Sequence, residues 1–531
     1  MTRLIAWLSF VVFLGAVLPA EAQTINAKSC SSNDVQTAFN SVSSSTTTVN
    51  IPAGTCNWTS QVTLTIPSGS AALSVLGAGS LTTTGGGDST VIVDNYASNN
   101  QLFVITTNSS ASSYFRLAGI SFEGGSGLVK WNGMVQVAGS SQSVRVDHTH
   151  FNATTYSPAN SSALLKFYGC LYGVVDHSIF DAPTGEPTND VQLYNGGTCN
   201  GDALGVGDQS WAAPTQLGTA NFIFLENNTF NNAWTNDCAE GGRFVIRYNT
   251  MNSAASQMHV TGGAGRHRGC RAWEFYNNTL NGSNSNPVPY ALWVDSGTGV
   301  MWGNSAPAGY ELGIDLLSVR INNSIYTQTA APAGWGYCGT AFNGTGSNWD
   351  QNSSTTTGYA CLDQPGRGQG DLLVGGFSSD GSGSNNVTNN ATGCTSSSSC
   401  AWPRQALEPI YEWNDTWAAV PGYGFPFLNN QATSVLQSNR DYYLWCNASS
   451  PTGCTTAFKG TVGTGSGLLS ARPSTCTTNV AYWATDTTTL YQCSSTNTWT
   501  TYYTPYTYPH PLTTGSGSPP APPTGLSAVV E

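Results

Sequence analysis

Hydrophobic and polar residues alternate in short runs that recur along the first part of the chain. In six eight-residue segments the first, third and eighth positions are almost always apolar, as at Val144, Val146 and Phe151. This alternation predicts a strand with one face turned toward a core, followed by a turn before the last apolar residue. The segments are FRLAGISF (115–122), VRVDHTHF (144–151), GVVDHSIF (173–180), IFLENNTF (223–230), FVIRYNTM (244–251) and WEFYNNTL (273–280).

These segments share one phase, and their last residues are separated by 29, 29, 50, 21 and 29 residues. Strand-turn repeats of this length cannot bury an apolar face alone, so they stack into a parallel β-helix with rungs about 4.8 Å apart. An antiparallel sandwich also has short strands, but it does not give a same-phase repeat. The longest interval corresponds either to two coils or to one long excursion.

A column of small polar residues occupies the predicted turn. Stacked side-chain amides hydrogen-bond from rung to rung, each bond contributing about 0.5–1.5 kcal/mol, so the column predicts a ladder. His148 and His177 adjoin the column in phase, and a repeated feature favours ladder-type hydrogen bonding over catalysis. The column runs through Thr149, Ser178, Asn228, Asn249, Asn278 and Asn323.

With the opening stretches VNIPAGTCNWTSQVTL and LSVLGAGS, these coils resemble the right-handed parallel β-helix superfamily of pectate lyase-like proteins, of the secreted bacterial type. The resemblance spans roughly residues 25–330 and implies an all-β, right-handed parallel β-helix. It indicates the fold far more strongly than the reaction, because this fold hosts lyases, hydrolases, epimerases and adhesins.

The chain is expected to divide into four parts. A basic start, an apolar run and AEA before Gln23 predict an export signal over 1–22 and hence a secreted protein. The β-helix with irregular final coils is expected over 23–440, and a small β cap that covers the open solenoid end over 441–512. A Pro/Gly/Ser linker follows over 513–531, and its PPTGLSAVV resembles the first strand of a fibronectin type III module.

Fourteen cysteines follow the predicted signal, a number typical of a protein that oxidises on export. Close spacing suggests disulfides between Cys394 and Cys400, Cys446 and Cys454, and Cys476 and Cys493. No later stretch approaches the roughly 20 apolar residues of a membrane span. The formal net charge of -12 argues against nucleic acid as a partner.

One column of the repeat carries Asp147, Asp176 and Glu226, followed by Arg247. Carboxylates stacked about 5 Å apart repel one another, so something must neutralise them. A calcium ion is one candidate, because it accepts oxygen ligands from carboxylate clusters and pectate lyase-like proteins often use it. The alternative is that Arg145 and Arg247 balance the row.

Histidine and arginine are concentrated between 258 and 280, although the chain has only 17 Lys+Arg and six His. This concentration predicts a positive field that attracts an anionic ligand to an acidic surface. The alternative is salt bridging, with Arg271 pairing Glu274, together with solvated loop arginines. The stretch holds His259, Arg266, His267, Arg268 and Arg271, with Arg243 and Arg247 one coil earlier.

An acidic polysaccharide suits such a field, and the preferred reaction is β-elimination on a uronate-containing polymer. Arginines or calcium would stabilise the charge that accumulates on the uronate carboxylate. His259 is the first candidate for the base, ahead of Arg266 and Arg268, and His267 or a water is the candidate acid. The catalytic set is thus His259, Arg266, His267, Arg268 and Arg271.

Two other function classes remain open, and the protein is expected to be a monomer. A glycoside hydrolase needs two carboxylates, for which the candidates are Asp202, Asp208 and Asp295. A non-catalytic adhesin would fit the Thr- and Asn-rich composition. Predicted substrate-binding residues are Arg243, Arg247, Trp211, Trp234 and Asp295, and Trp293 and Trp302 are further residues that could stack on sugar rings.

Overall fold

The structure is a computed structural model. It describes residues 22–108, 113–126, 133–155, 163–183, 189–194, 207–232, 234–259, 268–317, 363–370, 373–374, 386–387, 405–418, 420, 427–431, 433, 436–445 and 457–514. Apart from Ala22, the predicted signal lies outside these residues, and so does the predicted linker apart from Thr513 and Thr514. Among the described residues, no helix is long and apolar enough to span a membrane.

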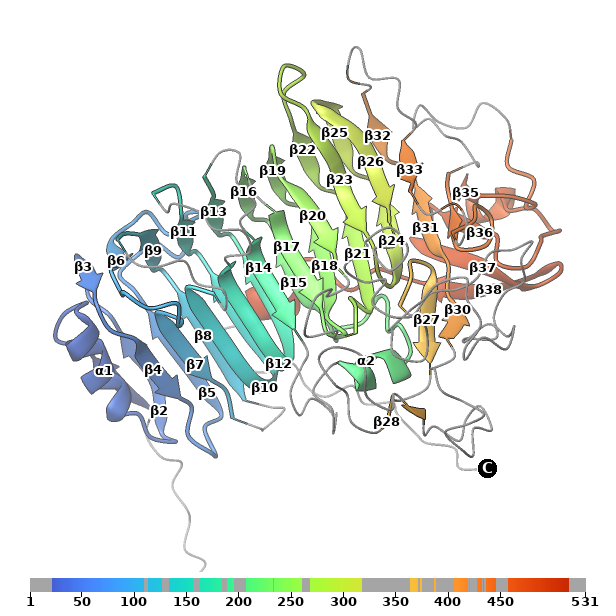
Figure 1. Cartoon of the computed structure of the whole chain (residues 1–531). Helices are drawn as coiled ribbons and strands as arrows, with labels where there is room; N and C mark the ends of the chain where they lie inside the picture. Colours follow the sequence, from blue (N-terminus) through green and yellow to red (C-terminus); the bar gives the residue numbers. More distant parts are fainter. Residues whose placement is uncertain are drawn as a thin grey trace, which may run out of the picture.

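The chain winds through three faces of parallel strands and forms a parallel β-helix, as the repeat predicted (Figure 1). Face one contains β4 (Val62–Thr65), β7 (Phe103–Thr106), the first parts of β10 (Val135–Asp147) and β12 (Ala163–Asp176), β14 (Asn189–Tyr194), β17 (Trp234–Ala239), β20 (Ala255–Met258), β23 (Val288–Val294), β26 (Tyr310–Leu316) and β33 (Leu428–Asn430). Because β10 and β12 continue around a corner, faces one and two merge into one sheet.

Face two contains β1 (Gln23–Asn26), β2 (Thr46–Asn50), β5 (Ala72–Leu76), β8 (Tyr114–Ala118), the last parts of β10 and β12, β15 (Ile223–Glu226), β18 (Arg243–Arg247), β21 (Ala272–Tyr276), β24 (Thr298–Trp302), β31 (Ile410–Trp413) and β34 (Tyr442–Tyr443). Face three contains β3 (Gly54–Trp58), β6 (Thr90–Asp94), β9 (Ser121–Gly124), β11 (His150–Asn152), β13 (Ile179–Asp181), β16 (Thr229–Asn231), β19 (Thr250–Asn252), β22 (Thr279–Asn281), β25 (Ser305–Ala308) and β32 (Thr416–Trp417).

Excursions leave the solenoid where face one passes into face two. The 50-residue interval is one coil, formed by β14, β15 and β16, with a long excursion that includes α2 (Asp208–Ala212). A longer excursion follows β26 and includes β27 (Arg367–Gly370), β28 (Leu373–Val374), β29 (Asn386–Val387) and β30 (Gln405–Leu407). Both excursions therefore begin at the carboxyl ends of face-one strands.

The core is built from columns of like side chains. The rings of Phe122, Phe151, Phe180 and Phe230 stack with centroids 5.3, 5.0 and 5.0 Å apart. The turn before this column adopts the left-handed region, with φ of 50°, 49° and 57° at His148, His177 and Asn227. Asn and His tolerate that conformation better than most residues, so the two histidines are partly explained by backbone geometry.

The predicted ladder is confirmed, with one correction. Side-chain amides of Asn228, Asn249 and Asn278 donate along the column over 3.2, 3.0 and 3.0 Å, the last to Asn304 Oδ1. Asn304 then donates to Asp415 over 2.8 Å. The rung after Asn278 is therefore supplied by Asn304, and the prediction of Asn323, which lies outside the described residues, was wrong for this rung.

Both ends of the solenoid are covered. Helix α1 (Ser32–Asn40) packs against β3 and β4 at the amino-terminal end. At the other end, β35 (Thr464–Gly467), β36 (Ala481–Ala484), β37 (Thr489–Ser495) and β38 (Thr498–Tyr503) form a small sheet (Figure 1). The disulfide Cys476–Cys493 joins the segment before β36 to β37, as predicted, and the other two predicted disulfides lie outside the described residues.

The last described segment, 504–514, runs back along face two and ends in α4 (Pro511–Thr514), next to β10 and β12. We call this segment the strap. The ring of Tyr508 stacks on Tyr248 with centroids 3.7 Å apart, and Leu512 is buried in a cluster with Phe224 and Val245. The strap therefore closes face two across several rungs and leaves face one as the face for the candidate site.

Candidate functional site

A row of polar and aromatic side chains crosses the outer surface of face one. The strand register places these residues side by side, because their neighbours in each strand point into the core. A second row lies two residues further along the strands and contains Tyr168, Tyr194, Ala239, His259 and Asp295. The first row contains Lys166, Gln192, Asp237, Gln257, Trp293 and Asp315.

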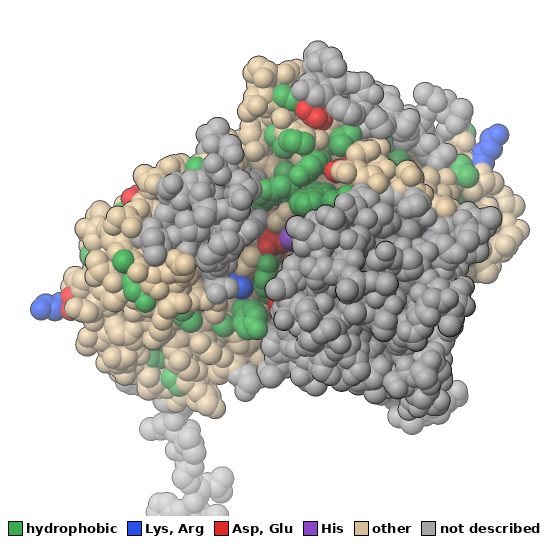
Figure 2. Space-filling view, in the orientation of Figure 1, with side chains coloured by type: hydrophobic (Ala, Val, Ile, Leu, Met, Phe, Trp, Pro, Cys, Tyr) green, Lys and Arg blue, Asp and Glu red, His purple; other side chains and the backbone are tan. Residues whose placement is uncertain are grey.

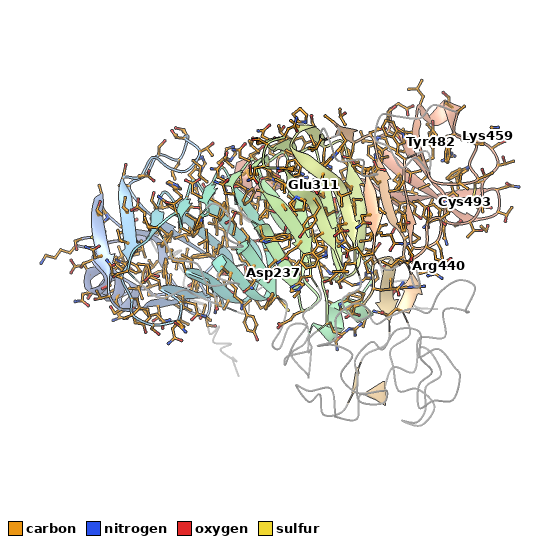
Figure 3. The ribbon with its side chains drawn as sticks, turned by 45° about the horizontal axis from the view of Figure 1, so that its top comes forward. Asp237, Glu311, Arg440, Lys459, Tyr482 and Cys493 are labelled. Carbon is orange, nitrogen blue, oxygen red and sulfur yellow. A yellow bond between two sulfur atoms is a disulfide. The ribbon has the colours of Figure 1, made fainter. Side chains whose placement is uncertain are left out.

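Asp237, on β17, is the centre of the polar contacts, and Figure 3 marks it near the middle of the solenoid. Its Oδ2 accepts hydrogen bonds from Gln192 Nε2 and Tyr194 Oη, both over 2.9 Å. Its Oδ1 lies 3.4 Å from His259 Nδ1. Burial would raise the pKa of Asp237, but the hydrogen bonds from His259, Gln192 and Tyr194 hold it below its ordinary value, so the carboxylate is ionised.

His259 follows β20 directly, and 30% of its side chain is exposed. Burial would lower the pKa of His259, but the hydrogen bond to Asp237 and the charges of Asp237 and Asp295 raise it to about 9. The imidazole is therefore protonated at neutral pH. A neutral imidazole is needed for the base role that the sequence predicted, so His259 fits a cationic or proton-donating role better.

A disulfide holds this arrangement together. Cys238 and Cys270 are joined, with their Cα atoms 5.1 Å apart. The N–H of His259 donates to the carbonyl of Cys238 over 2.9 Å, and the carbonyl of His259 accepts from the N–H of Cys270 over 3.0 Å. The disulfide and the two hydrogen bonds together tie Cys270 and His259 to the strand that carries Asp237.

Three half-buried aromatic rings lie beside this pair. Trp234 lies 5.6 Å from Tyr290 and 5.7 Å from Trp293 between ring centroids, and Tyr290 lies 6.1 Å from Trp293. His259 lies 5.9 Å from Trp293. Figure 2 shows hydrophobic side chains gathered over this part of the solenoid, with acidic and histidine side chains at their edge.

Lys166 closes the row on the other side of Asp237. Its Nζ lies 4.5 Å from the centroid of the Tyr194 ring and 5.6 Å from that of Tyr168. Burial lowers the pKa of Lys166, although the charges of Glu240 and Asp237 oppose this shift. Burial and the charge of Asp237 hold the pKa of Tyr194 well above its ordinary value, so Tyr194 stays a hydrogen-bond donor.

The predicted catalytic arginines of the loop lie in the protein interior. The guanidinium of Arg268 pairs with Asp363, with Nη2 2.9 Å from Oδ1, and that of Arg271 pairs with Glu408 over 3.0 Å. Both side chains are fully buried, and both lie over the ring of Trp211, which is itself buried. Arg271 pairs with Glu408 rather than with Glu274, so the salt bridge that the sequence suggested has a different carboxylate.

The two arginines of the preceding coil are also buried. Arg243 donates to the carbonyls of Ser210 and Pro214, both over 2.9 Å, and thereby holds the excursion that contains α2. Arg247 Nη2 pairs with Glu226 over 2.6 Å. The predicted ligand-binding roles of these four arginines and of Trp211 stay predictions, and protein groups surround all five side chains.

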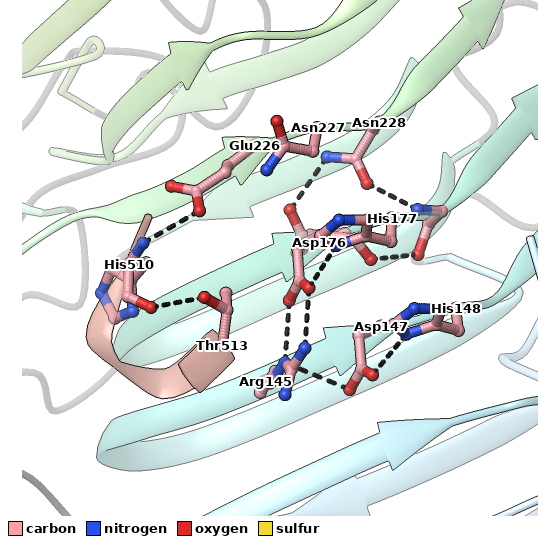
Figure 4. A network of polar contacts seen from close by, with 12 residues as sticks. Arg145, Asp147, His148, Asp176, His177, Glu226, Asn227, Asn228, His510 and Thr513 are labelled. Atoms are coloured by element: carbon pink, nitrogen blue, oxygen red, sulfur yellow. Dashed lines mark hydrogen bonds and ion pairs between the residues drawn. The ribbon is translucent and has the colours of Figure 1, made fainter. Parts of the chain in front are cut away.

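The acidic column is neutralised by side chains (Figure 4). Arg145 Nη2 pairs with Asp176 over 2.8 Å, while Asp147 pairs with Arg116 over 2.6 Å and with Arg145 over 3.3 Å. His148 and His177 donate from Nδ1 to Asp147 and Asp176 over 2.7 and 2.8 Å. Glu226 accepts from Arg247 and from the N–H of His510.

The donor set therefore does not fit the calcium ion predicted at Asp147, Asp176 and Glu226. Every carboxylate oxygen of the three residues accepts from a cationic side chain or a backbone N–H, so none of these oxygens is left for a metal. Within the described ranges, no group of three or more His, Cys, Asp or Glu side chains is arranged to hold a metal ion. Arg145 and Arg247 balance the row, which was the alternative.

The structure brings together His259, Asp295 and Trp234 of the predicted site residues. Arg266, His267 and Asp202 lie outside the described residues, as does the side chain of Asp208. Asp237, Lys166 and Tyr194 were not predicted. The alternation in TNDCA carried the missing signal, because a Cys238 that points inward to a disulfide turns Asp237 outward.

Comparisons with known proteins show weak structural likeness. No protein-family model matches the sequence, and no curated protein matches it. An alginate lyase from Paenibacillus sp. str. FPU-7 aligns at 13% identity and a TM-score of 0.33, over 55% of this chain and 98% of its own. The catalytic domain of a GH87 alpha-1,3-glucanase in complex with nigerose aligns at 14% identity and 0.27, over 57% of this chain and 61% of its own.

Proposed function

We propose that this protein is a polysaccharide-cleaving enzyme and that its active site lies on face one around Asp237, His259 and Asp295. The observation that carries the proposal is the Asp237–His259 pair, in which an ionised, buried carboxylate lies against a partly exposed imidazole. Perturbed ionisable groups beside aromatic rings are typical of an active site.

We propose hydrolysis as the reaction, the alternative that the sequence placed second. Near the Asp237–His259 pair, the acidic side chains of the two outer rows are Asp237, Asp295 and Asp315, and the basic ones are Lys166 and His259. Since Arg243, Arg247, Arg268 and Arg271 are buried elsewhere, the described part of this surface does not supply the excess of positive charge that a uronate polymer needs. Carboxylates are instead the groups that glycoside hydrolysis uses.

In this proposal Asp237 activates the attacking water and Asp295 protonates the leaving oxygen. Asp237 is suited to the base role because it is ionised. His259 lies beside Asp237 and orients its carboxylate. The strand register places Asp295 two strands from Asp237 and two residues further along the strands, about 12 Å between their main chains. A separation this wide favours the ~6.5–9.5 Å between carboxyl groups of inverting enzymes over the ~5–5.5 Å of retaining ones, so we propose inversion.

β-Elimination is the second candidate, because Lys166 has a lowered pKa and lies beside Tyr194 and Asp237. A lysine whose pKa is lowered gives up its proton more readily, and beside a hydrogen-bonded tyrosine it would form a base and acid pair. In that case the substrate would be a uronate polymer, with His259 facing its carboxylate.

The test is incubation of the full chain with neutral, pectic, alginate and glucuronan polysaccharides, following reducing ends and ultraviolet absorbance of unsaturated uronate ends. Hydrolysis predicts reducing ends without absorbance, and loss of turnover by at least about a hundredfold in Asp237→Asn and Asp295→Asn. Absorbance that rises with reducing ends would establish β-elimination instead. Neither signal on any polymer would favour a binding protein without catalysis.

A further inference from the structure

We infer that Trp234, Tyr290 and Trp293 form a platform that binds one uncharged pyranose unit of the substrate chain, next to the unit whose linkage is cleaved. This inference rests on the proposed function and adds a substrate class, a neutral polysaccharide. The platform is defined by these three residues, which come from β17 and β23.

The three rings form a tilted aromatic floor on the outward side of face one. Each pair is tilted, with interplanar angles of 37°, 41° and 38°, so the rings do not pack face to face against one another. All three side chains are half-buried, and the intervening strand β20 begins with the small residue Ala255, which pairs with Trp234. An aromatic floor with open faces receives the apolar C–H face of a sugar ring and leaves the hydroxyl groups at its rim.

Polar groups surround this floor. Trp293 lies between Gln257 and Asp315 in the row across the strands, and Asp315 accepts from Asn429 Nδ2 over 2.9 Å and from Gln431 Nε2 over 2.6 Å. Amide and carboxylate groups at the edge of an aromatic floor are suited to sugar hydroxyls. The platform therefore has the two kinds of contact that an uncharged sugar needs.

The charges beside the platform decide against a uronate in this position. Asp237 and Asp315 lie on either side of Trp293 within the first row, Asp315 next to it and Asp237 beyond Gln257. Among the described residues the adjacent cation is His259, and its imidazole is already paired with Asp237. A sugar carboxylate on the platform would be repelled by two carboxylates, whereas an uncharged sugar ring would not be repelled.

The platform is also correctly placed for catalysis. Trp293 and His259 lie 5.9 Å apart between ring centroids, about the length of one pyranose unit. A sugar that stacks on Trp293 therefore places its own glycosidic linkage, or that of its neighbour, beside Asp237. Binding on the platform would orient the linkage for attack.

The experiment measures binding apart from turnover. In the full chain carrying Asp237→Asn, tryptophan fluorescence and calorimetry would be followed with neutral hexaoses of the polymer that is cleaved, with α- and β-linked glucan hexaoses if none is, and with oligouronates of equal length. We expect a neutral hexaose to bind and oligouronates to bind at least about tenfold more weakly. Trp293→Ala should weaken neutral binding by at least about tenfold.

Trp293→Phe, which keeps a stacking ring, should retain most of the binding. The control is Trp499→Ala, which removes a half-buried tryptophan from the C-terminal sheet and should leave binding unchanged. Thermal unfolding of each variant would show that it is folded. Tighter binding of oligouronates, binding of amino-sugar oligomers alone, or unchanged neutral binding in both Trp293→Ala and Tyr290→Ala would overturn the platform.

These outcomes separate the two proposals. If the unmodified protein hydrolyses a polymer but the platform variants bind neutral hexaoses normally, the platform inference is refuted and the proposed hydrolysis stands. If binding depends on Trp293 but the unmodified protein cleaves no polymer, the proposed hydrolysis is refuted and the platform inference is supported.

Discussion

Replacing Arg247 with methionine tests whether this residue is structural or, as the sequence suggested, binds substrate. Its guanidinium is fully buried and donates to Glu226, to Tyr276 Oη over 2.8 Å, and to the carbonyls of Tyr506 and Thr507 over 2.7 and 2.8 Å. It thus joins three rungs of face two to the strap.

The magnitude follows from what the substitution leaves behind. Methionine has similar volume, so packing changes little, but Glu226 keeps only the N–H of His510 as a donor among these contacts. Removing one partner of a buried ion pair costs about 3–5 kcal/mol, because the other charge stays buried and uncompensated. We expect the thermal unfolding midpoint to fall by at least several degrees, with faster proteolysis of the strap.

Two further variants sharpen this test. Adding Glu226→Gln to Arg247→Met removes the stranded charge and should recover part of the loss. Arg116→Met is the matched control, because its partner Asp147 keeps Arg145 and His148 as partners, so the loss should be smaller. An unchanged unfolding midpoint together with lost polysaccharide turnover would refute the structural role and restore the substrate-binding one.

The remaining predictions concern the site and the ladder. Since the pKa of His259 is raised from 6.5 to about 9, the pairing with Asp237 should stabilise the fold fully below pH 6.5, and this stabilisation should be lost as the pH rises through about 9. A pH series of unfolding midpoints for the unmodified protein and His259→Gln should therefore converge above pH 9. Asn249→Ala should cost about 1–3 kcal/mol in denaturant unfolding, because it strands buried ladder groups on both sides. Replacing Cys238 and Cys270 with serine should lower turnover as well as stability, by about 2–4 kcal/mol, because the disulfide holds His259. Chelation should leave turnover and unfolding unchanged.

Each of these four predictions has its own contradicting result. Midpoints for the unmodified protein and His259→Gln that stay equally far apart from pH 6 to 10 would show that His259 does not pair with Asp237 in solution. An unchanged free energy of unfolding in Asn249→Ala would mean that water replaces the hydrogen bonds of the ladder. Unchanged turnover in the serine variant would show that His259 keeps its position without the disulfide. Loss of turnover on chelation would show that the reaction needs a metal ion.

Most of the fold could be predicted from the local sequence repeat. The repeated apolar positions indicate both the strand alternation and the place of each strand in its coil, as at Val144, Val146 and Phe151. This works because each strand of a solenoid meets equivalent neighbours at the same phase of the repeat. The ladder was predicted for the same reason from Asn228, Asn249 and Asn278. The error at Asn323 arose where the repeat became weak, since GVMWGNSA (299–306) and IYEWNDTW (410–417) depart from the pattern in their apolar positions.

The candidate site was predicted only in part. His259 stood out as a histidine in an irregular coil, and Asp295 as a carboxylate near tryptophan. The arginines stood out for the same reason, but a concentration of charge in the sequence does not show whether the partners are ligands or distant carboxylates of the chain. Arg268 meets Asp363 and Arg271 meets Glu408 across long excursions, which no local pattern indicates.

The sequence by itself determined the parallel β-helix, the Asn ladder and one disulfide, because these depend on periodicity and on residues close along the chain. Only the tertiary structure decided which outward side chains share a surface. Lys166, Asp237 and Trp293 are far apart in sequence and become neighbours because each coil returns to the same face one rung later, and the length of each excursion, not the local pattern, determines which residues meet.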